Sequence, residues 1–327
     1  MAEELYSIGI DLGGTNIVAV AYSSKRGILV KSKVASLAQE GAAGVLGRLA
    51  HEAKKVQALA GLPASKVVAV GLGSPGPLDA RRGIVLESPN IKGWHNYPVA
   101  RKLAAKVHHH VVLENDANAA AVGEHRLGAG RGCQDMLMLT LGTGVGGGII
   151  IAGKLFDGVD TCAGELGHIL LSPDGPMIPT GNRGTLEGYA SASGIARRAR
   201  ELMLKDKKSL LWKLCDGDIK HVSSKLVHTA FKRRDKVAKQ VWKETAFWLG
   251  RGMGSYINIF NPQRIVVAGG VMLGGDELLA MASKVAKAAA FKRPARTVKI
   301  LKAKLGDDAG VVGAAEIALD YARAARA

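Results

Sequence analysis

Short apolar runs joined by glycine-rich turns form the clearest pattern in the chain. Residues 7–10 and 17–21 have the apolar character of buried strands, and the polar residues 11–16 between them have the composition of a tight turn. The same pattern recurs in residues 136–151, where the turn is 142–147. Each segment predicts a β-hairpin whose turn is rich in backbone donors, and two similar hairpins indicate a duplicated fold.

Helical and strand periodicities alternate through the rest of the chain, which is typical of an α/β protein. The elements predicted between the hairpins are helices near 44–60 and 99–107 and strands at 67–72 and 111–113. Those predicted after the second hairpin are helices near 192–204, 236–259 and 277–290 and strands at 264–268 and 298–301. An alanine-rich amphipathic helix at 310–327 ends the chain, and periodicity does not say where it packs. With 327 residues, the chain is long enough for two lobes with a core each.

Several protein classes are disfavoured by composition. No apolar run reaches the length of about 18 residues that crosses a bilayer, and the first residues lack the pattern of a secretory signal. The cysteines, Cys133, Cys162 and Cys215, are odd in number and show no CxxC spacing. We therefore expect a soluble protein of the reducing cytoplasm, without a membrane partner.

The chain is strongly basic, with 45 Lys and Arg against 28 Asp and Glu and a formal charge of +17. Such a charge is compatible with a nucleic-acid partner, an anionic substrate or a basic proteome. Much of the excess lies in 205–208 and 232–236, which resemble solvated helix faces. Because no aromatic residues interleave with these charges, we expect no nucleic acid to bind. A basic stripe with steep salt dependence would argue otherwise.

Two turns are candidates for binding phosphate. Gly142, Gly144 and Gly147 satisfy the dinucleotide-binding pattern G-x-G-x-x-G, but that motif requires a following helix, and residues 148–151 have the pattern of a strand. No P-loop motif occurs. The turns at 11–16 and 142–147 can still offer several backbone N–H groups to phosphate oxygens, although each could also be an ordinary hairpin turn.

Acidic residues stand at the ends of predicted strands. Asp11 ends a buried strand, where a carboxylate is costly unless it binds a cation through water or caps the turn. Asp116 follows strand 111–113 and opens an alanine-rich helix, so it is either a helix N-cap or a catalytic base. Glu165 and His168, with Glu187 downstream, indicate weakly a metal site or a sugar-binding site.

Taken in order, six motifs resemble those of the ROK family of sugar kinases and sugar-responsive repressors. The motifs are DLGGTN at 11–16, GSPGPLD at 73–79, ENDAN at 114–118, GTGVGG at 142–147, GELGH at 164–168 and LEGYAS at 186–191. The repressors carry a DNA-binding helix-turn-helix before the first motif. Only ten residues precede Asp11 here, so the kinase is the expected class.

The resemblance implies an α/β fold of two lobes with a duplicated core, of the actin and Hsp70 ATPase type (ribonuclease H-like). Residues 1–117, completed by the helix 310–327, would form the smaller lobe, and 118–309 the larger. The implied activity is an ATP-dependent hexokinase that phosphorylates glucose at the 6-hydroxyl, with the sugar between the lobes and Asp116 as general base.

The resemblance also assigns binding roles to residues of these motifs. The residues expected to bind sugar are Gly76, Asn90, Asn115, Asp116, Glu165, His168 and Glu187. Those expected to bind the nucleotide are Asp11, Gly13, Gly14, Thr15, Asn16, Thr143, Gly144, Gly146, Gly147, Gly269 and Gly270. Asp11 would hold Mg²⁺ through water, so the expected cofactors are ATP and Mg²⁺.

One motif of the family is missing. After the histidine the family has the zinc knuckle CxCGxxGC, whereas residues 178–185 of this chain read IPTGNRGT. All three cysteine ligands are absent, so we expect no zinc and a hydrogen-bonded loop in its place. The loss leaves open what orients His168.

Several alternatives stay open at this stage. The substrate could be mannose, fructose or an N-acetylated hexosamine, and the phosphoryl donor could be inorganic polyphosphate. A sugar-binding relative without turnover is a further alternative. By resemblance alone, a homodimer or higher homo-oligomer is expected.

Overall fold

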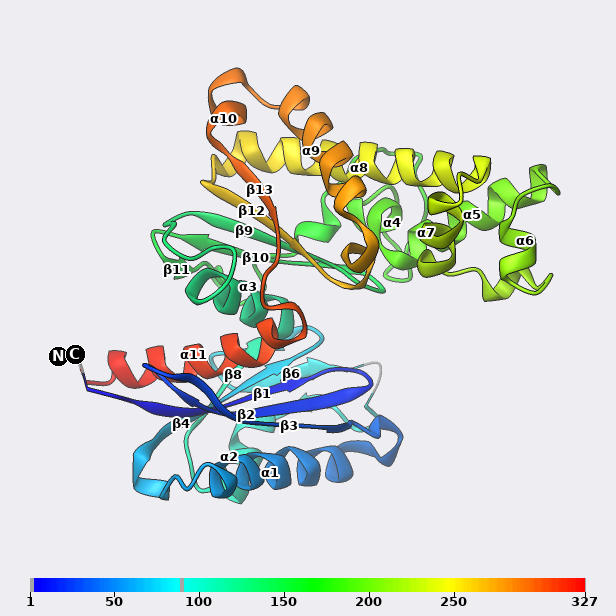
Figure 1. Cartoon of the computed structure of the whole chain (residues 1–327). Helices are drawn as coiled ribbons and strands as arrows, with labels where there is room; N and C mark the ends of the chain where they lie inside the picture. The colour runs from blue at the N-terminus through cyan, green and yellow to red at the C-terminus, as the bar shows by residue number, and fades with distance from the viewer. Residues whose placement is uncertain (1–2, 89–90, 327) are drawn as a thin grey trace. The chain divides into compact units, whose positions relative to one another are not determined.

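The structure is a computed structural model that describes residues 3–88 and 91–326. The chain folds into two compact units (Figure 1). The first unit comprises the chain up to Gly132 together with 148–164 and the residues from Lys304 onward, and the second comprises 133–147 and 165–303. The sequence-based boundary at 117/118 falls inside a helix of the first unit, and the C-terminal helix belongs to that unit.

The first unit is built on a mixed sheet of order β3-β2-β1-β4-β8. Its strands are β1 (Tyr6–Leu12), β2 (Asn16–Ser23), β3 (Gly27–Ala35), β4 (Val67–Ser74) and β8 (Val111–Asn115). β1, β2 and β3 pair antiparallel, whereas β4 runs parallel to β1 and β8 runs parallel to β4. The predicted first hairpin is therefore confirmed, and the carboxyl ends of β1, β4 and β8 lie at one edge of the sheet.

Helices cover both faces of this sheet (Figure 1). One face packs on α1 (Gly41–Leu59) and α2 (Val99–Val107), and the other on α11 (Ala309–Ala324), which also contacts α3 (Asp116–Arg126). A small antiparallel sheet of β5 (Leu78–Asp79), β6 (Ile84–Glu87) and β7 (His95–Tyr97) completes the unit.

The close packing of α11 on α3 depends on Gly313. A Cβ at this position would lie 1.6 Å from the backbone oxygen of Ala119, a distance that no side chain could tolerate. The helix whose destination periodicity left open is thus held in the core of the first unit by backbone-to-backbone contact.

The second sheet has the order β11-β10-β9-β12-β13, and the division between the units falls within β10. Its strands are β9 (Met136–Leu141), β10 (Val145–Ile151), β11 (Lys154–Leu155), β12 (Arg264–Ala268) and β13 (Lys299–Lys302). β12 runs parallel to both β9 and β13. Because β10 begins at Val145, the turn predicted over 142–147 is only three residues long, and Gly146 and Gly147 are strand residues.

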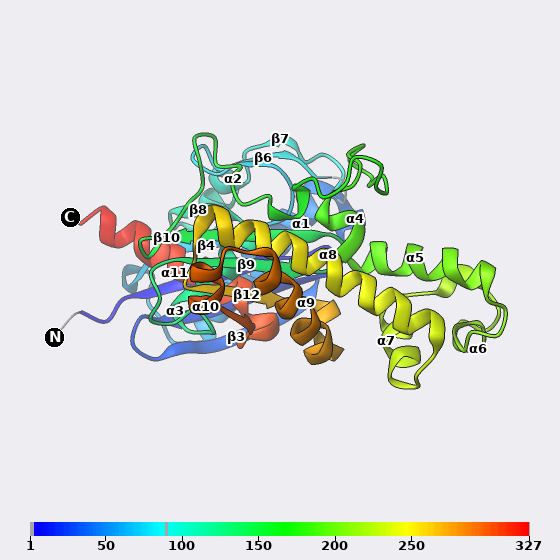
Figure 2. The same ribbon diagram turned by 90° about the horizontal axis from the view of Figure 1, so that it is seen from above.

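The second unit is rich in helix, as the periodicity predicts. Its helices are α4 (Leu186–Ala190), α5 (Ala192–Lys205), α6 (Leu211–Leu214), α7 (Ser224–Lys232), α8 (Lys236–Phe260), α9 (Asp276–Ala289) and α10 (Lys292–Thr297). The long helix α8 packs against α9 and against α4, α5 and α7, and α5, α6 and α7 gather around its first turns in both Figures 1 and 2.

The two units also contain short 3₁₀ helices. They lie at Ala38–Glu40, Ala64–Lys66, Leu166–His168, Ile219–His221, Gly270–Gly274 and Gly306–Asp308.

The basic excess is concentrated in one helical region. All twelve Lys and Arg side chains between 205 and 243 are exposed, which confirms the prediction of solvated helix faces.

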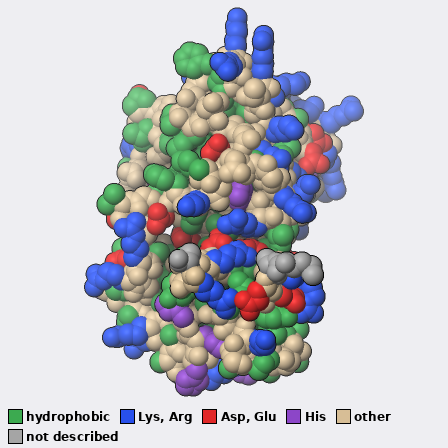
Figure 3. All heavy atoms as spheres, turned by 90° about the vertical axis from the view of Figure 1, so that its left-hand side faces the viewer, with side chains coloured by type: hydrophobic (Ala, Val, Ile, Leu, Met, Phe, Trp, Pro, Cys, Tyr) green, Lys and Arg blue, Asp and Glu red, His purple; other side chains and the backbone are tan. Residues whose placement is uncertain are grey.

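On the face that Figure 3 shows, Lys and Arg stand among acidic, histidine and apolar side chains without a continuous stripe. None of the helices in the described ranges is both long and apolar enough to cross a bilayer.

Candidate active site

The first glycine turn is held by its own backbone and by Ser36. The backbone N–H of Gly13 donates to the oxygen of Asn16 at 2.9 Å. The Ser36 hydroxyl donates to the oxygen of Gly14 at 2.9 Å, and its backbone N–H donates to the oxygen of Thr15 at 2.9 Å. These bonds use carbonyl groups of the turn, so the turn is fixed through its acceptors.

The Asp11 carboxylate lies beside this turn, near the end of β1. Its removal from water, reinforced by the negative charges of Asp116 and Asp307, raises the pKa of Asp11 to about 7. A Cβ at Gly310, in the first turn of α11, would lie 2.7 Å from Asp11 Oδ2. Asp11 is thus enclosed by β1 and α11 and is close enough to two other carboxylates to feel their charge.

Asp116 is the first residue of α3, and it is not the N-cap. The cap is Asn115, whose side-chain oxygen accepts from the backbone N–H of Ala117 at 2.9 Å and of Asn118 at 3.2 Å. Asp116 Oδ1 also accepts from Ala117 at 2.8 Å. Asp116 is half-buried, and the loss of water around its carboxylate raises its pKa despite these backbone bonds. Since Asn115 performs the capping, α3 does not need Asp116 as its cap.

Behind Asp116, Glu114 and Asn118 form a buried pair. Glu114 Oε1 accepts from the backbone N–H of Asn115 at 2.9 Å and from the Asn118 amide at 3.0 Å. Burial raises the pKa of Glu114, and these two hydrogen bonds oppose that effect. The pair joins the end of β8 to the first turn of α3, and this holds Asp116, the residue after the cap, in place.

In the second unit, α4 and the start of α5 hold the second glycine turn. The backbone N–H of Ala192 donates to the oxygen of Gly142 at 2.9 Å, and the Ser193 hydroxyl donates to the oxygen of Thr143 at 2.9 Å. Glu187 Oε2 accepts from the backbone N–H of Val145 at 2.9 Å. Glu187, an expected sugar ligand, therefore uses one carboxylate oxygen to hold this turn.

Glu165 and His168 lie at the two ends of a 3₁₀ turn in the second unit. His168 Nε2 is 3.8 Å from Glu165 Oε2, and the backbone N–H of His168 donates to the oxygen of Glu165 at 3.0 Å. The Tyr256 hydroxyl donates to the oxygen of Leu166 between them. The fold thus brings the histidine and carboxylate together and anchors them on α8.

A backbone hairpin stands where the family has its zinc knuckle. The backbone N–H of Leu171 donates to Gly184 at 2.8 Å, that of Gly184 to Pro176 at 2.9 Å, and that of Ile178 to Asn182 at 2.9 Å. Gly184 has a φ of +65° and lies so close to the backbone that a Cβ would be 1.6 Å from the Ser172 oxygen. Backbone hydrogen bonds therefore join the two sides of this loop, which confirms the prediction of a hydrogen-bonded loop.

The positions of the three family cysteines have other uses. Ile178 is buried, Thr180 is exposed, and the Thr185 hydroxyl caps α4 by accepting from the backbone N–H of Gly188 at 3.3 Å. Within residues 3–88 and 91–326, no group of three or more His, Cys, Asp or Glu side chains is arranged to hold a metal ion. The residues present therefore do not fit structural zinc.

The other residues predicted to bind the sugar or the nucleotide lie in turns, at the start of a strand, or outside the described ranges. Gly76 has a φ of +99°, and Gly269 has a φ of +96° immediately before the 3₁₀ helix that includes Gly270. Asn16 is the first residue of β2. Asn90 lies outside the described residues.

Sequence reasoning missed Ser36, Ser193 and Asp307. Ser36 and Ser193 each hold a glycine turn from a neighbouring element, and Asp307 contributes to the charge that acts on Asp11. Ser193 lies two residues past the last motif, so its position on the first turn of α5 was a usable signal. Ser36 and Asp307 carry no local signal, because their roles arise from strand pairing and from the docking of α11.

Comparison with known proteins finds the same pattern over nearly the whole chain. A model of the ROK family matches residues 7–321. A glucokinase of Thermotoga maritima is 37% identical over 96% of this chain and 97% of its own length. The crystal structure of a ROK family glucokinase from Streptomyces griseus in complex with glucose and AMPPNP is 36% identical, with a TM-score of 0.81 over 96% of this chain and 99% of its own. A ROK hexokinase from Thermus thermophilus is 33% identical, with a TM-score of 0.84 over 98% of this chain and 100% of its own.

Proposed function

The chain belongs to the ROK family, and from that premise we propose that it is an ATP-dependent glucokinase with Asp116 as its general base. The observation that carries the catalytic assignment is that Asn115, and not Asp116, caps α3. Asn115 caps the helix, so Asp116 is held in place without itself serving as the cap. The raised pKa of Asp116 makes it a better proton acceptor than an ordinary carboxylate once it is ionised.

The sugar contacts proposed from the family motifs are the Gly76 loop, Asn115, Asp116, Glu165, His168 and Glu187. A hexose exposes hydroxyl groups that each need a donor or an acceptor, and these side chains supply both. Nearly full-length similarity to glucokinases, one of them solved with glucose and AMPPNP, favours glucose and ATP.

The nucleotide contacts are proposed for the two glycine turns and for the turn at Gly269 and Gly270. Ser36 and Ser193 engage carbonyl oxygens of the first two turns. Several turn N–H groups can then face phosphate oxygens, which is how such concavities bind anions.

Asp11 is the residue proposed to hold Mg²⁺ through water. Its fit rests on charge, because the carboxylates of Asp116 and Asp307 act on it and a cation would relieve that repulsion. Mg²⁺ keeps most of its waters in proteins and needs only one or two carboxylates. When bound, it would neutralise charge on the transferred phosphoryl group.

The reaction follows from these placements. Asp116 accepts the proton of the 6-hydroxyl as the oxygen attacks the terminal phosphorus, and the bond to the ADP oxygen breaks. The turns position the phosphates and stabilise their charge. Positioning and electrostatics supply most of the rate enhancement, since phosphoryl transfer needs little covalent help from the protein.

A coupled assay of ADP release tests the function. With Mg-ATP, we expect turnover with glucose to exceed turnover with mannose, fructose, N-acetylglucosamine and N-acetylmannosamine. A zinc-selective chelator in excess Mg²⁺ should leave the rate unchanged, because the loop is closed by backbone bonds. Polyphosphate in place of ATP forms a separate arm. Absence of turnover with every sugar and both donors would contradict the proposal.

The pH profile should depend on magnesium. Asp11, with a pKa of about 7, must be ionised to hold the cation. Asp116, whose pKa is raised by burial, must be ionised to accept the proton of the sugar hydroxyl. We therefore expect kcat/KM for glucose to fall as the pH drops below about 7, since protonation removes both charges. Raising free Mg²⁺ at constant MgATP should move this fall to lower pH, because the cation stabilises the ionised carboxylate. A profile independent of free Mg²⁺ would remove Asp11 from the metal site.

A further inference from the structure

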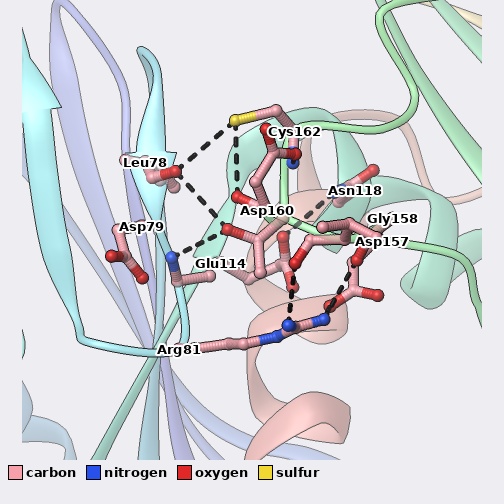
Figure 4. Close-up of polar contacts among 12 residues, drawn as sticks. Leu78, Asp79, Arg81, Glu114, Asn118, Asp157, Gly158, Asp160 and Cys162 are labelled. Carbon is pink, nitrogen blue, oxygen red and sulfur yellow. Dashed lines mark hydrogen bonds and ion pairs between the residues drawn. The ribbon is translucent and has the colours of Figure 1, made fainter.

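A short strap, defined as residues 157–162, is fastened to residues 78–81 within the first unit (Figure 4). Arg81 makes the most contacts. Its Nη1 donates to the oxygen of Val159 at 2.8 Å and its Nη2 donates to the oxygen of Gly158 at 3.0 Å. The same guanidinium is 3.7 Å from the Asp157 carboxylate. One side chain therefore holds three successive residues of the strap.

Thr161 and Cys162 fasten the end of the strap. The Thr161 hydroxyl accepts from the backbone N–H of Ala80 at 3.1 Å and donates to the oxygen of Leu78 at 3.4 Å. The Cys162 thiol is 3.7 Å from the same Leu78 oxygen (Figure 4). Thr161 is buried, so its hydroxyl satisfies two backbone groups that have little access to water.

The strap is held by polar contacts more than by apolar burial. Val159 at its tip has a relative exposure of 90%, so its side chain contributes almost no packing. Gly158 and Thr161 both have positive φ, at +75° and +63°. A threonine in this conformation is strained, and its hydrogen bonds to residues 78–81 compensate for that strain. Removing those bonds should release the strap.

The two fastened segments each adjoin a candidate sugar contact. Residues 78–81 begin two residues after Gly76, and the strap ends three residues before Glu165. On the basis of the proposed function, we propose that Arg81 and Thr161 are positioning residues for the sugar. They hold the Gly76 loop and the segment that leads to Glu165 in the conformation that binds glucose. They do not touch the reacting atoms.

The ion pair alone would not support this role. Arg81 is 61% exposed on its side chain, and an exposed ion pair contributes little in water. The two bonds to carbonyl oxygens and the two bonds of the buried Thr161 hydroxyl are the effective contacts. Each net hydrogen bond is worth about 1 kcal/mol, so the loss of one or two corresponds to about a 5- to 30-fold change in an equilibrium.

Two pairs of variants test the proposal by kinetics. Thr161→Val keeps the shape and removes the hydroxyl, whereas Thr161→Ser keeps the hydroxyl. Arg81→Ala removes the clamp, and Arg82→Ala is the matched control, because the Arg82 side chain is 76% exposed and pairs with Asp79, three residues before it. We expect Thr161→Val and Arg81→Ala to raise KM for glucose about fivefold or more. KM for ATP and kcat should stay within about twofold, and Thr161→Ser and Arg82→Ala should resemble the wild type.

Cys162 gives a readout that does not depend on activity. Cys162 is exposed, whereas Cys133 and Cys215 are buried, so a thiol reagent should modify Cys162 first. The rate of this modification should rise in Thr161→Val and Arg81→Ala, because the strap opens. Glucose should slow it in the wild type.

The outcomes separate this proposal from the proposed function. An unchanged modification rate in Thr161→Val and Arg81→Ala means that the contacts do not hold the strap, and the proposal is overturned. A raised rate with an unchanged KM for glucose overturns it too, because the strap then positions nothing. A wild type that phosphorylates no hexose overturns the proposed function, and the positioning role with it.

Discussion

Asparagine in place of Asp116 should lower kcat for glucose phosphorylation by about two to four orders of magnitude, the range that a general base contributes. The amide cannot accept the proton of the 6-hydroxyl. Its oxygen can still accept from the backbone N–H of Ala117, and Asn115 still caps α3, so the fold should be retained. KM for glucose and KM for MgATP should therefore change little.

The measurement is steady-state kinetics together with circular dichroism of each variant. Asp320→Asn is a suitable control, because it also removes one carboxylate of the first unit but lies on α11 in an ion pair with Arg126 at 2.8 Å. It should leave kcat and both KM values unchanged. If Asp116→Asn keeps wild-type turnover, the base lies elsewhere, and Asp11 becomes the first residue to examine.

Alanine at Gly313 should destabilise the protein by about 3 kcal/mol or more, the upper range for overpacking a core. Its Cβ would lie 1.6 Å from the backbone oxygen of Ala119 and 2.9 Å from the nitrogen of Gly123. Both atoms belong to the backbone of α3 and cannot move aside as a flexible side chain could. The new methyl group must therefore push α11 away from α3.

A matched control separates this clash from the general effect of removing glycine. Gly47 lies on the exposed side of α1, and a Cβ at this position would meet no atom within 4 Å, so Gly47→Ala should stabilise the protein by about 0.5–1 kcal/mol. Urea midpoints followed by circular dichroism compare the two variants with the wild type. A midpoint for Gly313→Ala at or above that of the wild type would show that the two helices can separate without cost.

Gly313→Ala and Asp116→Asn change the first unit in different ways: one changes the packing of two helices, and the other changes the chemistry of a side chain. Gly313 sets how closely α11 approaches α3, and α11 carries Gly310, which packs on the Asp11 carboxylate. The loss of stability in Gly313→Ala should therefore be accompanied by a weaker dependence of kcat/KM for glucose on free Mg²⁺. Asp116→Asn should leave the binding of Mg²⁺ at Asp11 unchanged. This difference links the packing of the helix to the chemistry of the site.

Local patterns were sufficient for most elements of the fold. The first hairpin, strand β9, strand β12 and helix α2 were predicted with ends that match or nearly match those observed, because each has a clear apolar run bounded by glycine or polar residues. Strand β3 was not predicted, since its alternating lysines and apolar residues mark a half-exposed strand that is recognisable only beside β2.

By itself, the sequence determined the kind of chemistry: a run of motifs that place carboxylates after strands, two glycine turns and no cysteines for zinc. Such features are local, because a turn or a cap is specified by a few adjacent residues. The tertiary structure alone decided that Asp307 acts on Asp11, that Ser36 holds the first glycine turn, and that Arg81 holds the strap. Those relations join residues far apart in the chain or depend on the surrounding burial, and burial and strand pairing exist only once the chain has folded.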